Sequence, residues 1–315
     1  MKYLKIIEPG FLTSVQDEGR YGHRGSGMPM AGAMDIYSHQ IANLLVGNNQ
    51  NDATLEITLT GPVIRFPGRM QIAITGADMN PSVNGKPVMM WRSINVTRGD
   101  TLSFGSLKSG VRSYLSVTGG ILESEIMGSR STYLRGRLGG HMGRKLFPED
   151  LIPVKPGISF FKKEIELPEQ LIPKWSSEII LRLLPGVDYD QFTGEAKELL
   201  TSSEFKVTHN SDRMGIRLSS TVLKHIEKAD VISYPIGPGT IQVPGDGQAV
   251  IMLSDSQTVG GYTQIASVIS ADLYKTGQLR PGDTIKFKLV SHDEALLFLK
   301  DHFNQLSSIF GEIKQ

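Results

Sequence analysis

The 315-residue chain contains no cysteine, which excludes disulfides, thiolate nucleophiles and metal sites ligated by cysteine. It also lacks an excess of charge of either sign, because 33 Lys and Arg residues stand against 32 Asp and Glu residues. Without a global basic field, the chain is not expected to bind nucleic acid or anionic lipid. Its chemistry must therefore use carboxylates, amides, hydroxyls, guanidinium groups or imidazoles.

Long apolar runs are also missing. No run approaches the roughly 18 residues of a membrane span, and the opening MKYLKIIEPGFLTSVQDEGR lacks the apolar core of a signal peptide. We therefore expect a cytoplasmic protein without a membrane partner. The phosphate-binding motif G-x-x-x-x-G-K-[ST], the nucleophile elbow G-x-S-x-G and the zinc motif H-E-x-x-H are absent as well. The 7 histidines include no pair with metal-ligand spacing, so no metal site is expected.

Short strand signals, separated by Gly, Pro, Asn or Asp, dominate what is present. LEITL, VIRF, QIAIT, TLSFG and VRSYLSV are β-branched or alternating, which predicts a mainly β protein built as an antiparallel sandwich or barrel. A few short helices interrupt the strands. We expect them from Asp35 as N-cap to Gly47, across DYDQFTGEAKELL with Asp188 as N-cap, and from about Asp293. The residues expected to face inward are Tyr37, Ile41, Leu44 and Leu45; Phe192, Ala196, Leu199 and Leu200; and Ala295, Leu296, Leu299 and Phe303.

The strand pattern ends between Pro153 and Trp175, where the sequence is charged and contains Pro153, Pro156, Pro168 and Pro173. We place a domain junction there, which gives domains over 1–165 and 175–315. A weak repeat indicates that the two halves are related. RGDTLSF around Asp100 matches PGDTIKF around Asp283, and IAITGAD resembles IMLSDSQ in the same order. The alternative is that Gly-Asp turns before strands are simply common in β proteins.

The first polar segment is VQDEGRYGHRGSGMPMAGAMD, residues 15–35, which contains five glycines. Such glycine density lets backbone N–H groups approach a ligand or another strand. Gln16, Asp17 and Arg20 are candidates for shaping a pocket or a subunit contact. The alternative is a long ordered loop that Asp–Arg pairs hold in place.

The second polar segment is HNSDRMGIRL, residues 209–218. Arg213, preceded by Asp212, is a candidate anion clamp because its planar guanidinium matches carboxylate oxygens, and Arg217 can act from the same direction. Spacing alone favours the alternative, a structural Asp–Arg pair. Two histidines also stand in polar surroundings, His209 beside this segment and His141 in LGGHMGRKL.

The third polar segment, IQVPGDGQAVIMLSDSQTVGGY, interrupts apolar strands with acceptors, amides and a Gly-Gly dyad. A carboxylate accepts from N–H, and a glutamine amide both donates and accepts, so these groups can hold a planar amide. A Gly-Gly bulge that redirects a barrel strand is compatible with this role. Asp255 and Gln257 are assigned with Arg213 to catalysis. Substrate binding is assigned to Gln242, Asp246, Gly260, Gly261 and Tyr262 of this segment, together with Asp212, His141, Gln16, Asp17 and Arg20.

Taken in order, several motifs resemble the biotin-dependent carboxyltransferase family. They are TSVQDEGRYGHRGSGMPMAGAMDIYSHQIANLLVGN, LEITLTGP, VNGKPV, LGGHMGRKLFPED, SDRMGIRL and GTIQVPGDGQAVIMLSDSQTVGGYTQIASVISADL. The resemblance covers the chain from about Leu4 to Leu289. It implies two tandem β-barrel units, the second of them cyclophilin-like.

The resemblance implies three alternative functions. One is a subunit of an ATP-dependent 5-oxoprolinase that opens the lactam of 5-oxoproline to glutamate, with ATP as cofactor of the complex and subunits A and B as partners. Another is a biotin-dependent carboxyltransferase acting on urea or a similar amide, and the third is a regulatory protein that binds a kinase inhibitor. The chain carries no biotinyl-lysine motif and no ATP-grasp region, and a stand-alone length favours the oxoprolinase. Oxoproline has a carboxylate and urea has none, so a functional arginine also favours it.

Overall fold

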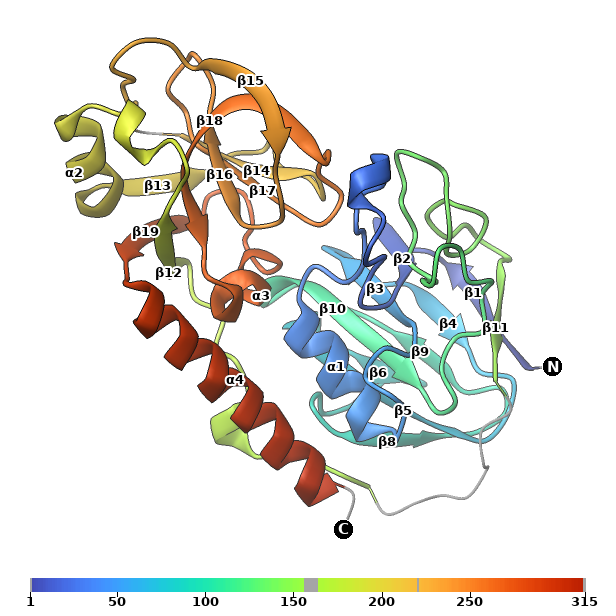
Figure 1. Cartoon of the computed structure of the whole chain (residues 1–315). Helices are drawn as coiled ribbons and strands as arrows, with labels where there is room; N and C mark the ends of the chain where they lie inside the picture. Colours follow the sequence, from blue (N-terminus) through green and yellow to red (C-terminus); the bar gives the residue numbers. More distant parts are fainter. Residues whose placement is uncertain (1, 156–163, 220, 314–315) are drawn as a thin grey trace. The chain divides into compact units, whose positions relative to one another are not determined.

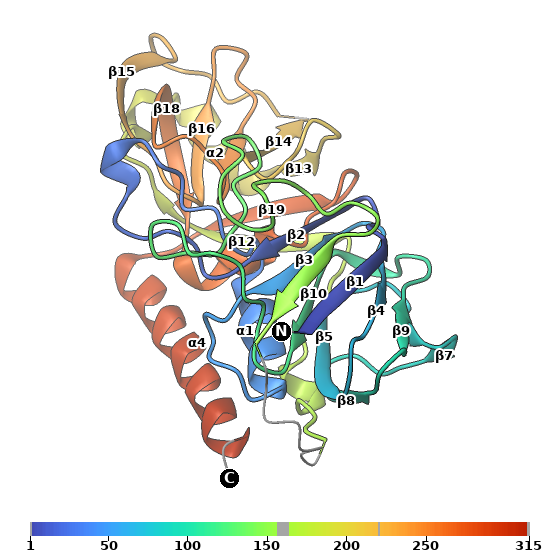
Figure 2. The ribbon, with the colours of Figure 1, turned by 90° about the vertical axis from the view of Figure 1, so that its right-hand side faces the viewer.

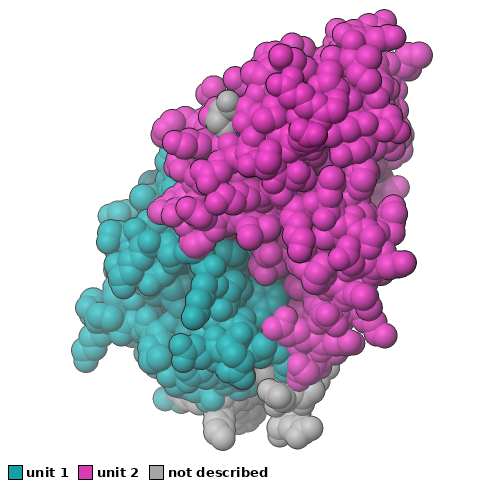
Figure 3. Space-filling view, turned by 90° about the vertical axis from the view of Figure 1, so that its left-hand side faces the viewer, with its two compact units in different colours: residues 1–21, 31–175, 309–315 teal, residues 22–30, 176–308 magenta. Residues whose placement is uncertain are grey.

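The computed structural model describes residues 2–155, 164–219 and 221–313, so Pro156 of the expected junction lies outside the described residues. The chain divides into two compact units, coloured separately in Figure 3. The expected domains were 1–165 and 175–315. In the structure, a short N-terminal segment also belongs to the second unit, and the C-terminal segment belongs to the first. Unit 1 comprises Met1–Tyr21, Ala31–Trp175 and Ile309–Gln315, and unit 2 comprises Gly22–Met30 and Ser176–Ser308.

Unit 1 contains two antiparallel sheets, whose strands Figures 1 and 2 label. The six-stranded sheet has the order β11-β1-β4-β9-β6-β7 and the five-stranded sheet the order β2-β3-β10-β5-β8. The first contains β1 (Lys2–Glu8), β4 (Val63–Arg65), β6 (Ser82–Val83), β7 (Lys86–Pro87), β9 (Thr101–Ser103) and β11 (Leu151–Val154). The second contains β2 (Leu12–Gln16), β3 (Thr54–Thr58), β5 (Met70–Asp78), β8 (Ser93–Val96) and β10 (Ser109–Val117).

Apolar side chains from both sheets of unit 1 form one core, to which Leu4 and Ile64 contribute from one sheet and Ile72 and Leu115 from the other. The helix α1 (Ile36–Leu45) packs on β5 and β10 of the five-stranded sheet. Because both faces of this sheet are covered, β3 is buried along its whole length and does not alternate between buried and exposed residues.

The predicted helix after Asp35 is confirmed. The Asp35 side chain accepts a hydrogen bond from the Ser38 N–H at 2.9 Å, and all four residues expected to face inward are buried. An N-cap carboxylate satisfies one of the amides that a helix leaves unpaired in its first turn. Both the start and the buried face of α1 were therefore predictable from local sequence.

Unit 2 is built around one eight-stranded sheet of order β12-β19-β13-β14-β17-β16-β18-β15, which an additional β12–β18 pairing closes into a barrel. All its pairings are antiparallel except β12 with β19, which is parallel. The strands are β12 (Glu178–Pro185), β13 (Glu204–Val207), β14 (Gly215–Ser219), β15 (Asp230–Pro235), β16 (Thr240–Val243), β17 (Val250–Met252), β18 (Val259–Val268) and β19 (Thr284–Leu289). The expectation of a mainly β protein is confirmed. Of the two expected β-barrel units, the second is this closed barrel, whereas the strands of unit 1 form two separate sheets.

The second predicted helix begins later than expected. α2 (Gly194–Ser202) has Thr193 as its N-cap, whose side chain accepts from the Ala196 N–H at 3.2 Å. Asp188 precedes only a short 3-10 turn, η3 (Tyr189–Gln191), because its carboxylate bonds instead to the Tyr234 hydroxyl and the Gln264 N–H. The expected cap at Asp188 was therefore wrong, since a tertiary contact took the carboxylate that a local cap needs.

The third predicted helix is α4 (His292–Ile313), which begins within a residue of the expected position. Its expected inner face was wrong at two of four residues, because Leu296 is 63% exposed and Phe303 57% exposed, whereas Ala295 packs against a buried apolar cluster. The helix instead buries Leu306, and Arg182 of β12 stacks on the Phe298 ring at 3.6 Å. Apolar residues on both sides of α4 left its periodicity ambiguous, and tertiary contacts decided the face. The remaining short elements are η1 (Arg24–Ser26), η2 (Glu169–Leu171), η4 (Ser270–Asp272) and α3 (Leu273–Thr276).

The matching Gly-Asp motifs form the same local structure. The Asp100 carboxylate accepts from the Thr97 N–H at 2.7 Å before β9, and the Asp283 carboxylate accepts from the Arg280 N–H at 2.9 Å before β19. The upstream pair diverges, since IAITGAD lies in β5 whereas IMLSDSQ covers the end of β17 and the loop after it. No helix in the described part of the chain has the length and apolarity that crossing a membrane requires.

Candidate functional site

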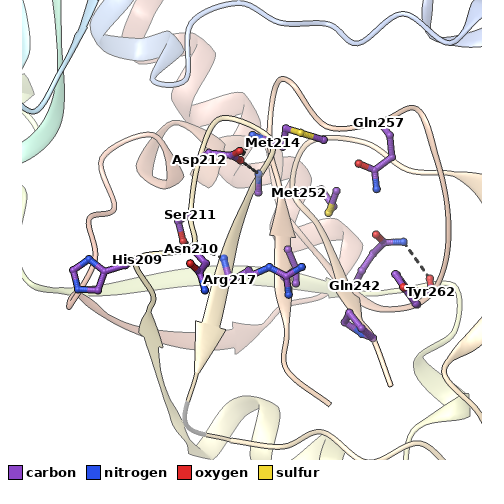
Figure 4. Close-up of a pocket in the computed structure, with 13 residues that line it drawn as sticks. His209, Asn210, Ser211, Asp212, Met214, Arg217, Gln242, Met252, Gln257 and Tyr262 are labelled. Carbon is purple, nitrogen blue, oxygen red and sulfur yellow. Dashed lines mark hydrogen bonds between the residues drawn. The ribbon is translucent and has the colours of Figure 1, made fainter. Parts of the chain in front are cut away.

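A pocket of about 470 Å³ lies in unit 2, where the strands β14, β16, β17 and β18 meet two loops. One loop joins β13 to β14, and the other joins β17 to β18. Figure 4 shows the side chains that these elements present to the pocket. The labelled lining residues are His209, Asn210, Ser211, Asp212, Met214, Arg217, Gln242, Met252, Gln257 and Tyr262.

Arg217 is the cation of this pocket. Side chains alternate across a strand, so the barrel interior takes Ile216 and Leu218 of β14, and the opposite face presents Arg217 to the pocket. In the view of Figure 4, Arg217 lies between His209 on one side and Gln242 on the other. Among the residues that the structure describes, the Arg217 side chain has no hydrogen-bond or ion-pair partner. Its guanidinium is therefore available to an anionic ligand group.

Two glutamine amides face the same pocket. Gln242 of β16 is buried, and its Nε2 donates to the Tyr262 carbonyl at 3.2 Å. This bond fixes the amide and leaves its carbonyl oxygen as an acceptor. Gln257 is the exposed residue of an otherwise largely buried loop after β17, and within the described residues its amide bonds to no other group. The pocket thus offers one anchored and one available amide.

Gly260 makes the position of Gln242 possible. A Cβ atom added to Gly260 would lie 2.6 Å from Nε2 of Gln242, closer than real Cβ contacts come. Gly261 is also closely approached, because its added Cβ would lie 3.2 Å from the Val231 carbonyl of β15. The Gly-Gly dyad therefore opens space for a pocket side chain and for a neighbouring strand.

Asp255 and Arg213 form a buried pair with each other behind the pocket. Nε and Nη2 of Arg213 donate to the two Asp255 oxygens at 3.0 Å each, and both side chains are 5% exposed. This geometry is bidentate, the arrangement that a guanidinium and a carboxylate favour. The structure thus pairs the proposed amide acceptor with the proposed anion clamp, which is the Asp–Arg pairing kept as an alternative for Arg213.

The pair fastens the two loops of the pocket together. The Asp255 N–H donates to the Arg213 carbonyl at 3.0 Å, and the Leu253 N–H donates to the Met214 carbonyl at 3.0 Å. Asp212 shapes the other side of the junction, because its Oδ1 accepts from the N–H groups of Met214 and Gly215. Asp255, Arg213 and Asp212 therefore hold the loop that carries Gln257 against the loop that carries Met214.

The other sequence candidates lie outside this pocket. Asp246 is exposed in the turn after β16, where its Oδ1 accepts from the Gln248 N–H at 3.0 Å. His141 belongs to unit 1, and its Nδ1 lies 2.7 Å from a Glu123 oxygen. The hydrogen bond to Glu123 raises the pKa of His141 above its ordinary value, which favours the charged imidazolium.

Gln16, Asp17 and Arg20 are buried in unit 1 and hold one segment of it in place. Gln16 Nε2 donates to the Thr132 carbonyl at 3.1 Å, Asp17 Oδ1 accepts from Ser129 Oγ at 2.7 Å, and Arg20 donates to the Ser131 carbonyl. Each of the three bonds to the segment 129–132 across a long sequence separation. The three residues therefore stabilise the fold of unit 1, and none of them lines the pocket of unit 2.

Sequence reasoning assigned the anion to Arg213 and left Arg217 as a secondary possibility, whereas the structure places Arg217 in the pocket. The alternation of GIRLS contained the signal, since a strand that buries Ile216 and Leu218 must turn Arg217 away from the barrel. Met214 and Met252 were missed, because an isolated methionine in sequence does not distinguish a core from a pocket wall. Across the described residues, no cluster of three or more His, Asp or Glu side chains forms a potential metal site.

The chain is similar to several known proteins over most of its length. The family described as carboxyltransferase domain, subdomain A and B, matches residues 26–289. The chain is 37% identical over 307 residues to the C subunit of 5-oxoprolinase from Escherichia coli (strain K12), and the match covers 96% of this chain and 97% of that protein. It is 34% identical to the C subunit of 5-oxoprolinase from Haemophilus influenzae, with 93% of each chain covered.

Longer proteins contain a similar region. Urea amidolyase of Lachancea kluyveri is 36% identical over 92% of this chain, but the match covers 17% of that protein. The crystal structure of the K. lactis urea amidolyase superposes with a TM-score of 0.92 at 33% identity, covering 98% of this chain and 20% of that one. This chain therefore spans about a fifth of urea amidolyase but nearly the whole of the bacterial 5-oxoprolinase relatives.

Proposed function

The chain belongs to the carboxyltransferase domain family with subdomains A and B, and we propose that it is the C subunit of an ATP-dependent 5-oxoprolinase. The proposal includes partner subunits and a cytoplasmic location, where ATP is supplied. The subunit names of the bacterial relatives support the partnership. The observation that carries the substrate assignment is a guanidinium, unpaired among the described residues, that faces two glutamine amides in one pocket.

5-Oxoproline offers three polar groups that these side chains match. Its carboxylate suits Arg217, because guanidinium and carboxylate form strong charge-assisted hydrogen bonds. Its lactam N–H suits the carbonyl oxygen of Gln242, and its lactam oxygen suits the amide N–H of Gln257. Met214 and Met252 provide apolar contact for the ring methylenes. The pocket therefore binds and orients a planar cyclic amide.

The residues of this pocket fit the amide better than they fit ATP. A triphosphate needs several cations, or a loop of N–H groups at a helix N-terminus, whereas the lining supplies Arg217 as its one arginine and no lysine among the described residues. We therefore assign ATP binding to other subunits of the complex. In that arrangement ATP supplies the activation of the amide, and the side chains of unit 2 hold the lactam flat and its carboxylate fixed.

The test is ATP-dependent release of glutamate from 5-oxoproline by the purified complex of this chain with its partner subunits. Arg217→Met is expected to lower kcat/KM by roughly tenfold to a hundredfold, the effect of losing a charge-assisted hydrogen bond. Arg217→Lys is expected to recover part of the loss. Arg65→Met, at an exposed arginine of unit 1, is the matched control and should leave kcat/KM unchanged.

The similarity to urea amidolyase supports a second candidate, a biotin-dependent carboxyltransferase acting on urea. Urea fits the two amides but has no carboxylate for Arg217. Under this alternative the complex carboxylates urea, and Arg217→Met changes kcat/KM for urea by less than about twofold. Urea carboxylation without oxoproline cleavage would replace the first proposal by the second.

A further inference from the structure

Unit 1 contains a separate pocket of about 620 Å³ to which the proposed function assigns no role. Its wall combines the end of β5, the start of β10, the segment that follows β7 and the residues 172–175. The size falls within the range typical of small-molecule sites. Trp91 and Trp175, the only 2 tryptophans of the chain, both line it.

The two indoles are held in place by other residues of unit 1. Trp175 Nε1 donates to the Gly76 carbonyl of β5 at 3.3 Å. The Tyr37 ring packs against Trp91 with 6.5 Å between ring centroids, and its hydroxyl donates to the Leu171 carbonyl at 2.7 Å. Tyr37 of α1 therefore supports both the Trp91 wall and the chain that leads to the Trp175 wall.

Trp91 has an uncommon backbone conformation. Its φ is 59°, a left-handed value that bulky side chains rarely adopt. Two hydrogen bonds enforce it: the Trp91 N–H donates to the Ile74 carbonyl at 2.8 Å, and the Trp91 carbonyl accepts from the Leu167 N–H at 2.9 Å. An enforced, unfavourable backbone at the wall of a pocket is typical of binding sites.

The wall also carries one charge of each sign. Lys108 Nζ lies 3.6 Å from Asp78 Oδ2, and the two side chains are 58% and 39% exposed. Such an exposed pair contributes little to stability, so both charges can turn to a ligand at small cost. Met89, which is 61% exposed, adds an adaptable apolar surface beside the indoles.

We propose that this pocket binds a free α-amino acid with a large apolar or aromatic side chain. Lys108 contacts the α-carboxylate, Asp78 contacts the α-ammonium group, and Trp91, Trp175 and Met89 contact the side chain. The assignment follows from the opposite charges at one wall and the aromatic walls beside them. It concerns unit 1 and does not depend on the activity proposed for the pocket of unit 2.

Both tryptophans line the pocket, so intrinsic fluorescence of the full-length chain reports its occupancy directly. L-phenylalanine is the probe, because its own fluorescence is not excited where tryptophan is selectively excited. We expect a saturable change in tryptophan emission, confirmed by calorimetric titration. Two derivatives test the charged contacts: N-acetyl-L-phenylalanine lacks the ammonium group, and phenethylamine lacks the carboxylate. The affinity of each is expected to be at least about tenfold lower than that of L-phenylalanine.

Variants then assign each contact. Lys108→Met is expected to weaken phenylalanine about tenfold while leaving phenethylamine unchanged, and Asp78→Asn to weaken phenylalanine similarly while leaving the N-acetyl derivative unchanged. The asparagine keeps the oxygen that accepts from the Asn80 N–H at 2.9 Å, so folding is expected to persist. Arg217→Met, in unit 2, is the control and leaves these affinities unchanged.

Two results would overturn the proposal: phenylalanine that produces no saturable emission change and no calorimetric signal, or equal affinity for phenylalanine and both derivatives. Because the test measures binding to unit 1 and not turnover, loss of the oxoprolinase proposal would leave its outcome intact. Equally, failure to bind phenylalanine would leave the role of Arg217 unaffected.

Discussion

Asp255→Asn tests whether the buried pair with Arg213 supports the pocket. The substitution keeps the size of the side chain but removes the charge that Nε and Nη2 of Arg213 contact at 3.0 Å. Both side chains are 5% exposed, so water cannot replace the lost carboxylate. Removing one partner of a buried ion pair costs about 3–5 kcal/mol, because the remaining charge stays in a poorly polarisable interior.

A loss of that size is large for a domain as small as unit 2. It corresponds to a fall in the thermal midpoint on the order of 10 °C, measured by calorimetry or by the circular dichroism of the isolated chain. Asp190→Asn is the matched control, since Asp190 is 98% exposed and pairs with Lys197 at 2.9 Å in the same unit. An exposed pair contributes less than about 1 kcal/mol, so the control midpoint is expected to change little.

A double variant separates structure from recognition. Asp255→Leu together with Arg213→Leu removes both buried charges, and we expect it to recover much of the stability that Asp255→Asn loses. The double variant also removes the hydrogen bonds that join the two side chains across the loops, so turnover in the complex stays low. If Asp255→Asn unfolds within a degree or so of the unchanged chain, the pair does not carry the stability derived from its geometry.

Two further predictions concern local geometry and pH. Gly260→Val is expected to displace the Gln242 amide, because Nε2 of Gln242 lies 2.6 Å from the position of an added Cβ. We expect KM for 5-oxoproline to rise about tenfold. Gly194→Ala is the control and should leave KM unchanged, because an added Cβ there has open space around it. The Glu123 contact raises the pKa of His141 above 6.5, so its contribution to stability is present below about pH 6.5 and is lost as the pH rises through the folded-state value. The measurement is the thermal midpoint as a function of pH. In His141→Gln the midpoint is expected to lose this part of its pH dependence, and the same pH profile in the variant as in the unchanged chain would rule out His141 as the cause.

The parts of the fold that the sequence predicted were those that local chemistry decides. Asp35 caps α1 because its carboxylate finds the Ser38 N–H three residues away, a contact visible in the sequence itself. Asp188 looked equally suitable, but its carboxylate bonds to Tyr234 and Gln264, which are remote in sequence. A single sequence shows local partners and not distant ones, so the same residue type was predicted correctly once and wrongly once.

The candidate site follows the same division. Gln242, Gln257 and Tyr262 were predicted, because polar side chains interrupting apolar strands stand out in any single sequence. The arginine was harder, since Arg213 and Arg217 belong to one short segment and differ only in what surrounds them. The carboxylate that buries Arg213 lies 42 positions away, and only the folded barrel brings the two together.

The buried pair also explains how a loop residue can act with strand residues in one pocket. Arg217 and Gln242 stand on barrel strands, β14 and β16, so the barrel fixes their positions. Gln257 stands on a connecting loop, so the pairing of barrel strands does not fix its position. The loop is instead joined to its neighbour by two backbone hydrogen bonds and by the pair of Asp255 with Arg213. Recognition of a small rigid amide needs its donors and acceptors held to within a fraction of an ångström, and a bidentate buried pair gives the loop a rigidity that its sequence alone would not provide.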